Sequence, residues 1–76
     1  MKSVKIRLST IEEVRRFVDT VLKYPGETDL SSGRYIVDAK SIMGIFSLDL
    51  MNPIILTAQD EDAPALFEEL KSYIVK

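Results

Sequence analysis

A short apolar segment at residues 41–48 most strongly constrains how this chain can fold. It begins with Ser41, whose hydroxyl can cap a helix, and continues with five large apolar residues in seven positions. Gly44 in the middle disfavours a regular strand, so the segment is predicted to be a helix of about two turns. At helical spacing Ile45 and Leu48 share one face. Two turns cannot bury all five large side chains, so part of this apolar surface is expected to be exposed and available for contact.

Composition excludes several classes of function. The 76 residues are predicted to form one domain, residues 1–76, with a net charge of −2 from ten basic and twelve acidic residues mixed along the chain. A nucleic-acid-binding protein needs a concentrated basic face, and a membrane span needs about 20 apolar residues; neither pattern is present. The sequence contains no cysteine and no histidine, so we expect no disulfide, no metal site, no cofactor and no phosphohistidine. Without a signal-peptide pattern, a cytoplasmic location is expected.

A strand and an amphipathic helix are predicted before the short apolar segment. Apolar and polar residues alternate over residues 4–8, as in a half-buried strand. Two capping boxes fit the residues that follow: Ser9 with Glu12, or Thr10 with Glu13. The sequence does not decide between them. The helix is predicted to end near Tyr24, before Pro25. Its apolar stripe comprises Ile11, Val14, Phe17, Val18, Val21 and Leu22.

A hairpin is predicted before the short helix, and a strand and a helix after it. The hairpin pairs residues 27–30 with 34–39 around the turn at 31–33. Pro53 suits the first position of the next strand, which continues to Ala58. Pro64 must lie in the first turn of the last helix, which favours Asp62 as its cap. The apolar stripe of that helix is Leu66, Phe67, Leu70, Tyr73 and Ile74. The order β-α-β-β-α-β-α predicts an α+β fold, one sheet covered on one face.

Residues Asp38–Leu48 resemble the regulatory-serine segment of HPr, the small phosphocarrier of the bacterial sugar phosphotransferase system, and the core KSIMG is specific. The resemblance implies an HPr-like open-faced sandwich, in which a four-stranded antiparallel sheet of order 1-4-2-3 carries all helices on one side. The resemblance also favours Asp60, and not Asp62, as the N-cap of the last helix. The first residue of that helix is therefore left undecided between these alternatives. The uncovered sheet face is expected to carry Lys5, Arg7, Ile36, Asp38, Ile55 and Thr57.

The same resemblance implies that the phosphocarrier reaction is absent. An ungapped alignment places the histidine of the family at Thr10, its arginine at Glu12 and its proline at Glu13. Threonine cannot form the labile phosphoramidate, and two carboxylates repel an incoming phosphoryl group. We therefore predict that the protein is not an enzyme and that Thr10 is a helix cap.

In the HPr family, the serine at the position of Ser41 is phosphorylated by an ATP-dependent kinase and then read by transcriptional regulators. Adjacent apolar residues dock other phosphotransferase proteins. The resemblance therefore implies that Lys40, Ile42, Met43 and Phe46 form a protein-binding surface, with Met43 and Phe46 partly exposed and Ile45 and Leu48 buried. A purely structural role of Ser41 as a cap stays an alternative.

Three functions are considered. The first is a regulatory module without phosphohistidine transfer, acting through Ser41 and the adjacent apolar helix on a phosphotransferase protein, an HPr serine kinase or a transcriptional regulator. The second is a phosphoryl carrier that uses the hydroxyl of Thr10 or Ser41. The third is a structural module that dimerises weakly through Ile36 and Ile55 on the open sheet face, although a monomer is the primary expectation.

Overall fold

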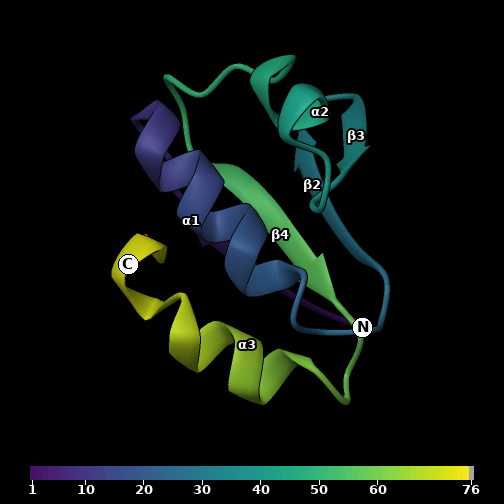
Figure 1. Cartoon of the computed structure of the whole chain (residues 1–76). Coiled ribbons are helices and arrows are strands. Elements are labelled where there is room, and N and C mark those ends of the chain that lie inside the picture. Colours follow the sequence, from purple (N-terminus) through teal and green to yellow (C-terminus); the bar gives the residue numbers. More distant parts are fainter. Residues whose placement is uncertain (76) are drawn as a thin grey trace.

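Four strands form one antiparallel sheet in the order β1-β4-β2-β3, in a computed structural model that describes residues 1–75. The strands are β1 Lys2–Ile6, β2 Thr28–Ser32, β3 Tyr35–Asp38 and β4 Ile54–Ala58. The helices are α1 Ile11–Val21, α2 Ile42–Phe46, α3 Ala63–Glu69 and the 3₁₀ turn η1 Lys71–Tyr73. All three α-helices lie on the same side of the sheet (Figure 1). The predicted open-faced α+β sandwich and its strand order are confirmed.

The outer edge of β1 is partly covered by residues near the end of the chain. The Arg7 N–H donates to the Tyr73 carbonyl at 2.9 Å, and the Val75 N–H donates to the Lys5 carbonyl at 2.9 Å. These two bonds flank an isolated bridge between Ile6 and Ile74. Strand β1 is two residues earlier than predicted, and β3 occupies the opposite edge of the sheet.

Helix α1 begins at the second of the two capping boxes. Four residues of its predicted stripe are buried: Val14, Phe17, Val18 and Val21. The prediction was wrong for Ile11 and Leu22, which are 67% and 57% exposed. At 100° per residue, these two side chains lie roughly 70–90° from the centre of the buried stripe. They therefore project beside the core instead of into it.

The hairpin turn begins two residues later and ends one residue later than predicted. Ser31 and Ser32 belong to β2, and the loop consists of Gly33 and Arg34. Gly33 has a φ of +59°, a conformation that side chains with a Cβ rarely adopt. The position of this glycine therefore sets the turn, because a two-residue hairpin loop requires positive φ.

The C-terminal helix is shorter than predicted, because α3 ends at Glu69 and the chain continues as η1. Pro64 lies in the first turn, and Asp62 occupies the N-cap position without a side-chain capping bond. The Asp62 carboxylate instead accepts a hydrogen bond from the Gly26 N–H at 3.2 Å. Asp60 pairs with the N-terminal ammonium at 2.8 Å. Among residues 1–75, no helix is long and apolar enough to cross a membrane.

The core fills the space between the sheet and the helices, because one side of each strand is apolar. In the middle of the sheet, Leu30 pairs with Leu56 and Val37, and Leu56 pairs with Val4. The other side of the sheet carries a second row across all four strands. In register this row is Lys5, Ile55, Ser31 and Ile36. Ile36 is 69% exposed, in agreement with its predicted place on the uncovered face.

Candidate protein-binding surface

Ser41 caps α2, as its place before the apolar segment predicts. Its Oγ accepts a hydrogen bond from the Gly44 N–H at 3.1 Å, and its backbone is extended. Helix α2 has five residues between its caps, shorter than the two turns expected. At its other end the Ser47 hydroxyl donates to the Gly44 carbonyl at 2.5 Å. Both ends of this short helix are thus held by serine side chains that bond to the same residue.

Gly44 allows α2 to lie close to β3. A Cβ at this position would lie 3.2 Å from the Val37 Cβ and 3.2 Å from the Ser41 Oγ. Both distances are shorter than ordinary van der Waals contact. The glycine therefore brings the backbone of the helix against Val37 and leaves the Ser41 cap undisturbed.

The two faces of the segment differ in exposure as predicted. Ile45 is fully buried and Leu48 is 6% exposed. On the other face, Met43 is 82% exposed and Phe46 is 42% exposed. Ile42, also expected at this surface, is 38% exposed. The predicted exposure is confirmed, whereas the use of these side chains in binding stays a prediction.

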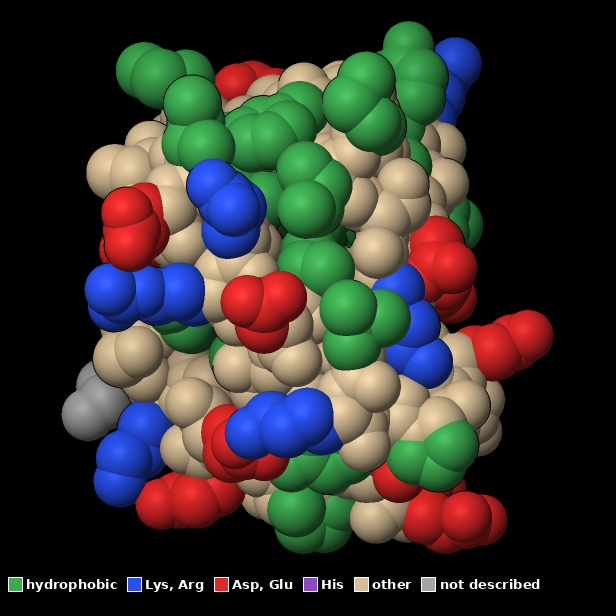
Figure 2. Space-filling model, in the orientation of Figure 1, with side chains coloured by type: hydrophobic (Ala, Val, Ile, Leu, Met, Phe, Trp, Pro, Cys, Tyr) green, Lys and Arg blue, Asp and Glu red, His purple; other side chains and the backbone are tan. Residues whose placement is uncertain are grey.

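Two further exposed apolar residues lie outside the segment and were missed from the sequence. Ile11 opens α1, and Met51, in the loop that follows α2, is 83% exposed. Figure 2 shows hydrophobic side chains gathered along the edge of the molecule where α1 begins and α2 lies. We call these five residues the apolar patch: Ile11, Ile42, Met43, Phe46 and Met51. The offset of Ile11 from the centre of its helical stripe could have revealed its exposure.

Thr10, where the alignment places the family histidine, is the N-cap of α1. Its Oγ1 accepts from the Glu13 N–H at 3.0 Å, and the Glu13 carboxylate accepts from the Ser9 and Thr10 N–H groups at 2.8 and 3.2 Å. The capping-box prediction for Thr10 and Glu13 is confirmed, and the alternative box of Ser9 with Glu12 does not form. The arrangement satisfies the first amides of α1 without any added group.

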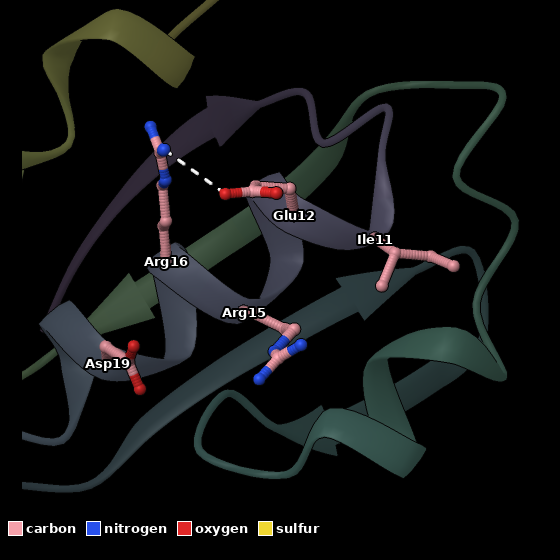
Figure 3. A pocket seen from close by; sticks show the side chains of 5 residues that line it. All are labelled: Ile11, Glu12, Arg15, Arg16 and Asp19. Atoms are coloured by element: carbon pink, nitrogen blue, oxygen red, sulfur yellow. Dashed lines mark hydrogen bonds and ion pairs between the residues drawn. The ribbon is translucent and has the colours of Figure 1, made fainter.

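A shallow hollow runs along the exposed side of α1 (Figure 3). Glu12, aligned with the family arginine, pairs with Arg16 one turn later at 3.2 Å. The Arg15 side chain extends away from that pair. The hollow also includes Ile11, which belongs to the apolar patch, and Asp19. The charges at this end of the molecule are therefore mixed.

Lys40 lies directly before the cap, as predicted, and is half-buried. Its backbone N–H donates to the Asp38 carboxylate at 2.8 Å, which orders the chain between β3 and α2. The acidic segment at residues 60–62 lies elsewhere, at the start of α3. Within residues 1–75, no three acidic side chains are arranged to share a metal ion.

One polar cluster joins the end of α1 to α3, away from the apolar patch. The Lys23 ammonium bonds to the Glu69 carboxylate at 2.6 Å, and the Tyr24 hydroxyl donates to its other oxygen. Hydrogen bonds from Lys23 and then Tyr24 hold the pKa of Glu69 below its ordinary value of 4.5. The bond to Glu69 also raises the pKa of Tyr24. The cluster has a structural explanation, since it ties two helices together.

Comparison with known proteins identifies the family. Residues 12–76 match the PTS-HPr family model, described as the PTS HPr component phosphorylation site. The chain belongs to the HPr family. A comparison with curated protein sequences gave no match. The match begins at Glu12 and does not include Thr10, so the alignment of Thr10 with the family histidine rests on extending the alignment without gaps. Ser41 lies well inside the matched residues.

Solved structures of HPr proteins have the same fold. HPr-C-His from Thermoanaerobacter tengcongensis is 29% identical with a TM-score of 0.81, over 95% of this chain and 89% of that one. The phosphocarrier protein HPr from Bacillus anthracis is 27% identical with a TM-score of 0.73, over 97% and 94%. Crh from Bacillus subtilis, a catabolite repression protein described as a swapped dimer, is 30% identical with a TM-score of 0.69, over 92% and 82%. The chain is thus similar to phosphocarriers and to Crh.

Proposed function

We propose that this HPr-family protein is a regulatory module of the sugar phosphotransferase system that binds a partner protein through α2 without transferring phosphohistidine. The exposure of Met43 and Phe46 directly after Ser41 carries this proposal. A helix that is firmly capped yet leaves large apolar side chains in water provides a preformed contact surface. The absence of histidine from the sequence supports the loss of phosphohistidine transfer. The expected place of action is the cytoplasm.

Ser41 is the proposed regulatory position. Its Oγ attacks the γ-phosphorus of ATP bound to an HPr serine kinase, forming an oxygen–phosphorus bond while ADP leaves and a proton is lost. The phosphate adds close to two negative charges beside Ile42 and Met43. A partner that buries these apolar side chains would then have to accommodate the phosphate as well. Phosphorylation would in this way exchange one partner, such as a phosphotransferase protein, for another, such as a transcriptional regulator.

A phosphoryl carrier that uses a hydroxyl group is the less favoured function. The Thr10 and Ser41 hydroxyls both accept helix-capping bonds, and the Glu13 carboxylate accepts a bond from the Thr10 N–H, which places a negative charge beside Thr10. A phosphate ester of serine or threonine also transfers its phosphoryl group poorly. We therefore expect no transferable phosphate after incubation with phosphoenolpyruvate and the general phosphotransferase enzyme.

Intact mass after incubation with an HPr serine kinase and ATP tests the regulatory position. The native chain and a Ser47→Ala variant should each gain one phosphoryl group, whereas Ser41→Ala should gain none. Ser47 is a matched control because it bonds to the same residue from the other end of α2. An unmodified native chain that is folded, or a phosphorylated Ser41→Ala variant, would contradict the proposed role of Ser41.

Titration calorimetry with the same kinase, and with the general phosphotransferase enzyme, tests the binding surface separately. We expect Met43→Ser to raise the Kd by about tenfold, the effect of losing a well-buried contact at an interface. Leu22→Ser is the control, since Leu22 is 57% exposed at the far end of α1. Equal affinities of the two variants would place the contact outside α2.

A further inference from the structure

Strand β3 is an edge strand whose protection against pairing is limited to its short length and the charge of Asp38. It is made of Tyr35, Ile36, Val37 and Asp38, and it contains no proline, lysine or bulge. Tyr35 is 72% exposed and Ile36 is 69% exposed. The other edge of the sheet, at β1, is partly covered by residues 73–75. An added strand would therefore find its place beside β3.

The hydrogen-bond pattern shows which backbone groups of β3 point outward. The Ala39 N–H donates to the Thr28 carbonyl at 2.9 Å, so residue 39 bonds inward, toward β2. Because bonding alternates along an antiparallel strand, residues 37 and 35 also bond inward. The backbone N–H and carbonyl of Ile36, and the N–H of Asp38, consequently point away from β2, toward the free edge. Ile36 therefore presents both a donor and an acceptor at the free edge.

We propose that two copies of this chain associate by pairing β3 with β3, antiparallel, about a two-fold axis at Ile36. In this register Ile36 faces Ile36 of the second copy, and their outward N–H and carbonyl groups exchange two hydrogen bonds. Tyr35 then faces Val37 of the second copy. The two four-stranded sheets join into one of eight strands.

Charge complementarity selects this register. Arg34 directly precedes β3, and Asp38 ends it, so the two-fold axis places Arg34 of each copy opposite Asp38 of the other. Among residues 1–75, Arg34 has no ion pair, and only one oxygen of the Asp38 carboxylate is used, by the Lys40 N–H. Parallel pairing in register would instead bring like charges together. Of the two in-register pairings, only the antiparallel one therefore places opposite charges of Arg34–Asp38 next to each other.

Pairing at this edge also extends the apolar row of the open face. Ile55, Ser31 and Ile36 lie in one row across β4, β2 and β3, and the two-fold axis continues that row into the second copy. The contact differs from a stacking of two open faces, which would bury Ile55 against its equivalent. The paired strands themselves contain no residue of the apolar patch.

Charge reversal tests the register. Sedimentation equilibrium of the native chain up to about 1 mM should show a mass that rises from 8.6 kDa toward twice that value. Arg34→Asp alone and Asp38→Arg alone should each weaken self-association by about tenfold or more. An equimolar mixture of the two variants should restore it, because both cross-pairs then join an Asp to an Arg. A native mass that stays at 8.6 kDa at all concentrations, or a mixture that self-associates no more strongly than either variant alone, would overturn the proposal.

Disulfide trapping gives a second measurement. The chain has no cysteine, so each variant reports on one position. Ile36→Cys should cross-link readily in air, because paired residues of this kind have Cα atoms about 5.5 Å apart, within the disulfide range. Tyr35→Cys is equally exposed, but its equivalents lie diagonally, roughly 8 Å apart, and should cross-link at least about tenfold more slowly. Cross-linking of Tyr35→Cys at the same rate, or of Ile55→Cys instead, would contradict the β3 pairing. Circular dichroism of every variant checks that the fold is intact.

Discussion

Truncation of two adjacent side chains in α2 should have very different effects on stability. Ile45 is fully buried, so Ile45→Ala removes core contacts and leaves a cavity, at a cost of about 2–5 kcal/mol. Phe46 is 42% exposed. Scaling the roughly 3–5 kcal/mol of a fully buried Phe→Ala change by the buried three-fifths gives about 2–3 kcal/mol. Since its open side leaves no closed cavity, we expect about 1–2 kcal/mol for Phe46→Ala.

Urea unfolding followed by circular dichroism separates these values. A domain of this size has a total stability of about 4–11 kcal/mol, so Ile45→Ala removes a large share of it. With a slope of about 1 kcal/mol per M, its midpoint should fall by about 2–5 M, and that of Phe46→Ala by about 1–2 M. Leu48→Ala, at a buried position, should behave like Ile45→Ala. Equal and large losses at positions 45 and 46 would mean that the faces of α2 are assigned wrongly.

Three further outcomes are expected in the same assay. Thr10→Ala and Glu13→Ala should each lower the free energy of unfolding by about 1 kcal/mol. The double variant should lower it by clearly less than the sum, because both residues form one capping box. Additive losses would show that the box does not form in solution. Gly33→Ala should cost about 1–2 kcal/mol from backbone strain alone, since its φ is +59° and no atom lies within 4 Å of the added Cβ; an unchanged midpoint would mean a different turn. Glu69 has a lowered pKa in the folded state, so its stabilising contribution is present above pH 4.5 and is lost as the pH falls through the folded pKa. Glu69→Gln should therefore lose stability at pH 7 and show a flatter decline between pH 5 and 3, and an identical decline would contradict the role of Lys23.

The strands and helices could be predicted because their apolar residues follow simple periods. Alternation marked β1 and β4, and the 3–4 residue spacing marked α1 and α3. The Ser41 cap was predictable because a hydroxyl before an apolar run satisfies the first amides of a helix. The strand order was predicted from the resemblance to HPr and not from the periodicity of the sequence.

Some positions were missed or left open by the sequence analysis. Ile11 and Leu22 fit the apolar stripe of α1, yet the sheet does not extend beneath the side on which they lie. Asp62 could have capped α3, but its carboxylate bonds to Gly26 across the fold. Two adjacent capping boxes were also indistinguishable, because choosing between them requires the first residue of the helix. The bond of Asp62 in particular depends on a residue distant in the sequence.

The covered edge of β1 limits how large an assembly of these molecules can become. A sheet with two open edges can add a molecule at each end, and the result is a fibre without a fixed size. Here residues 73–75 bond to β1 between Lys5 and Arg7, so one edge is already engaged within the chain. The proposed contact at β3 would use the edge of each copy that has no such cover. Further growth of the proposed pair would require a strand to bind at β1, where residues 73–75 already bond, and removal of these residues would open that edge to a chain that can extend.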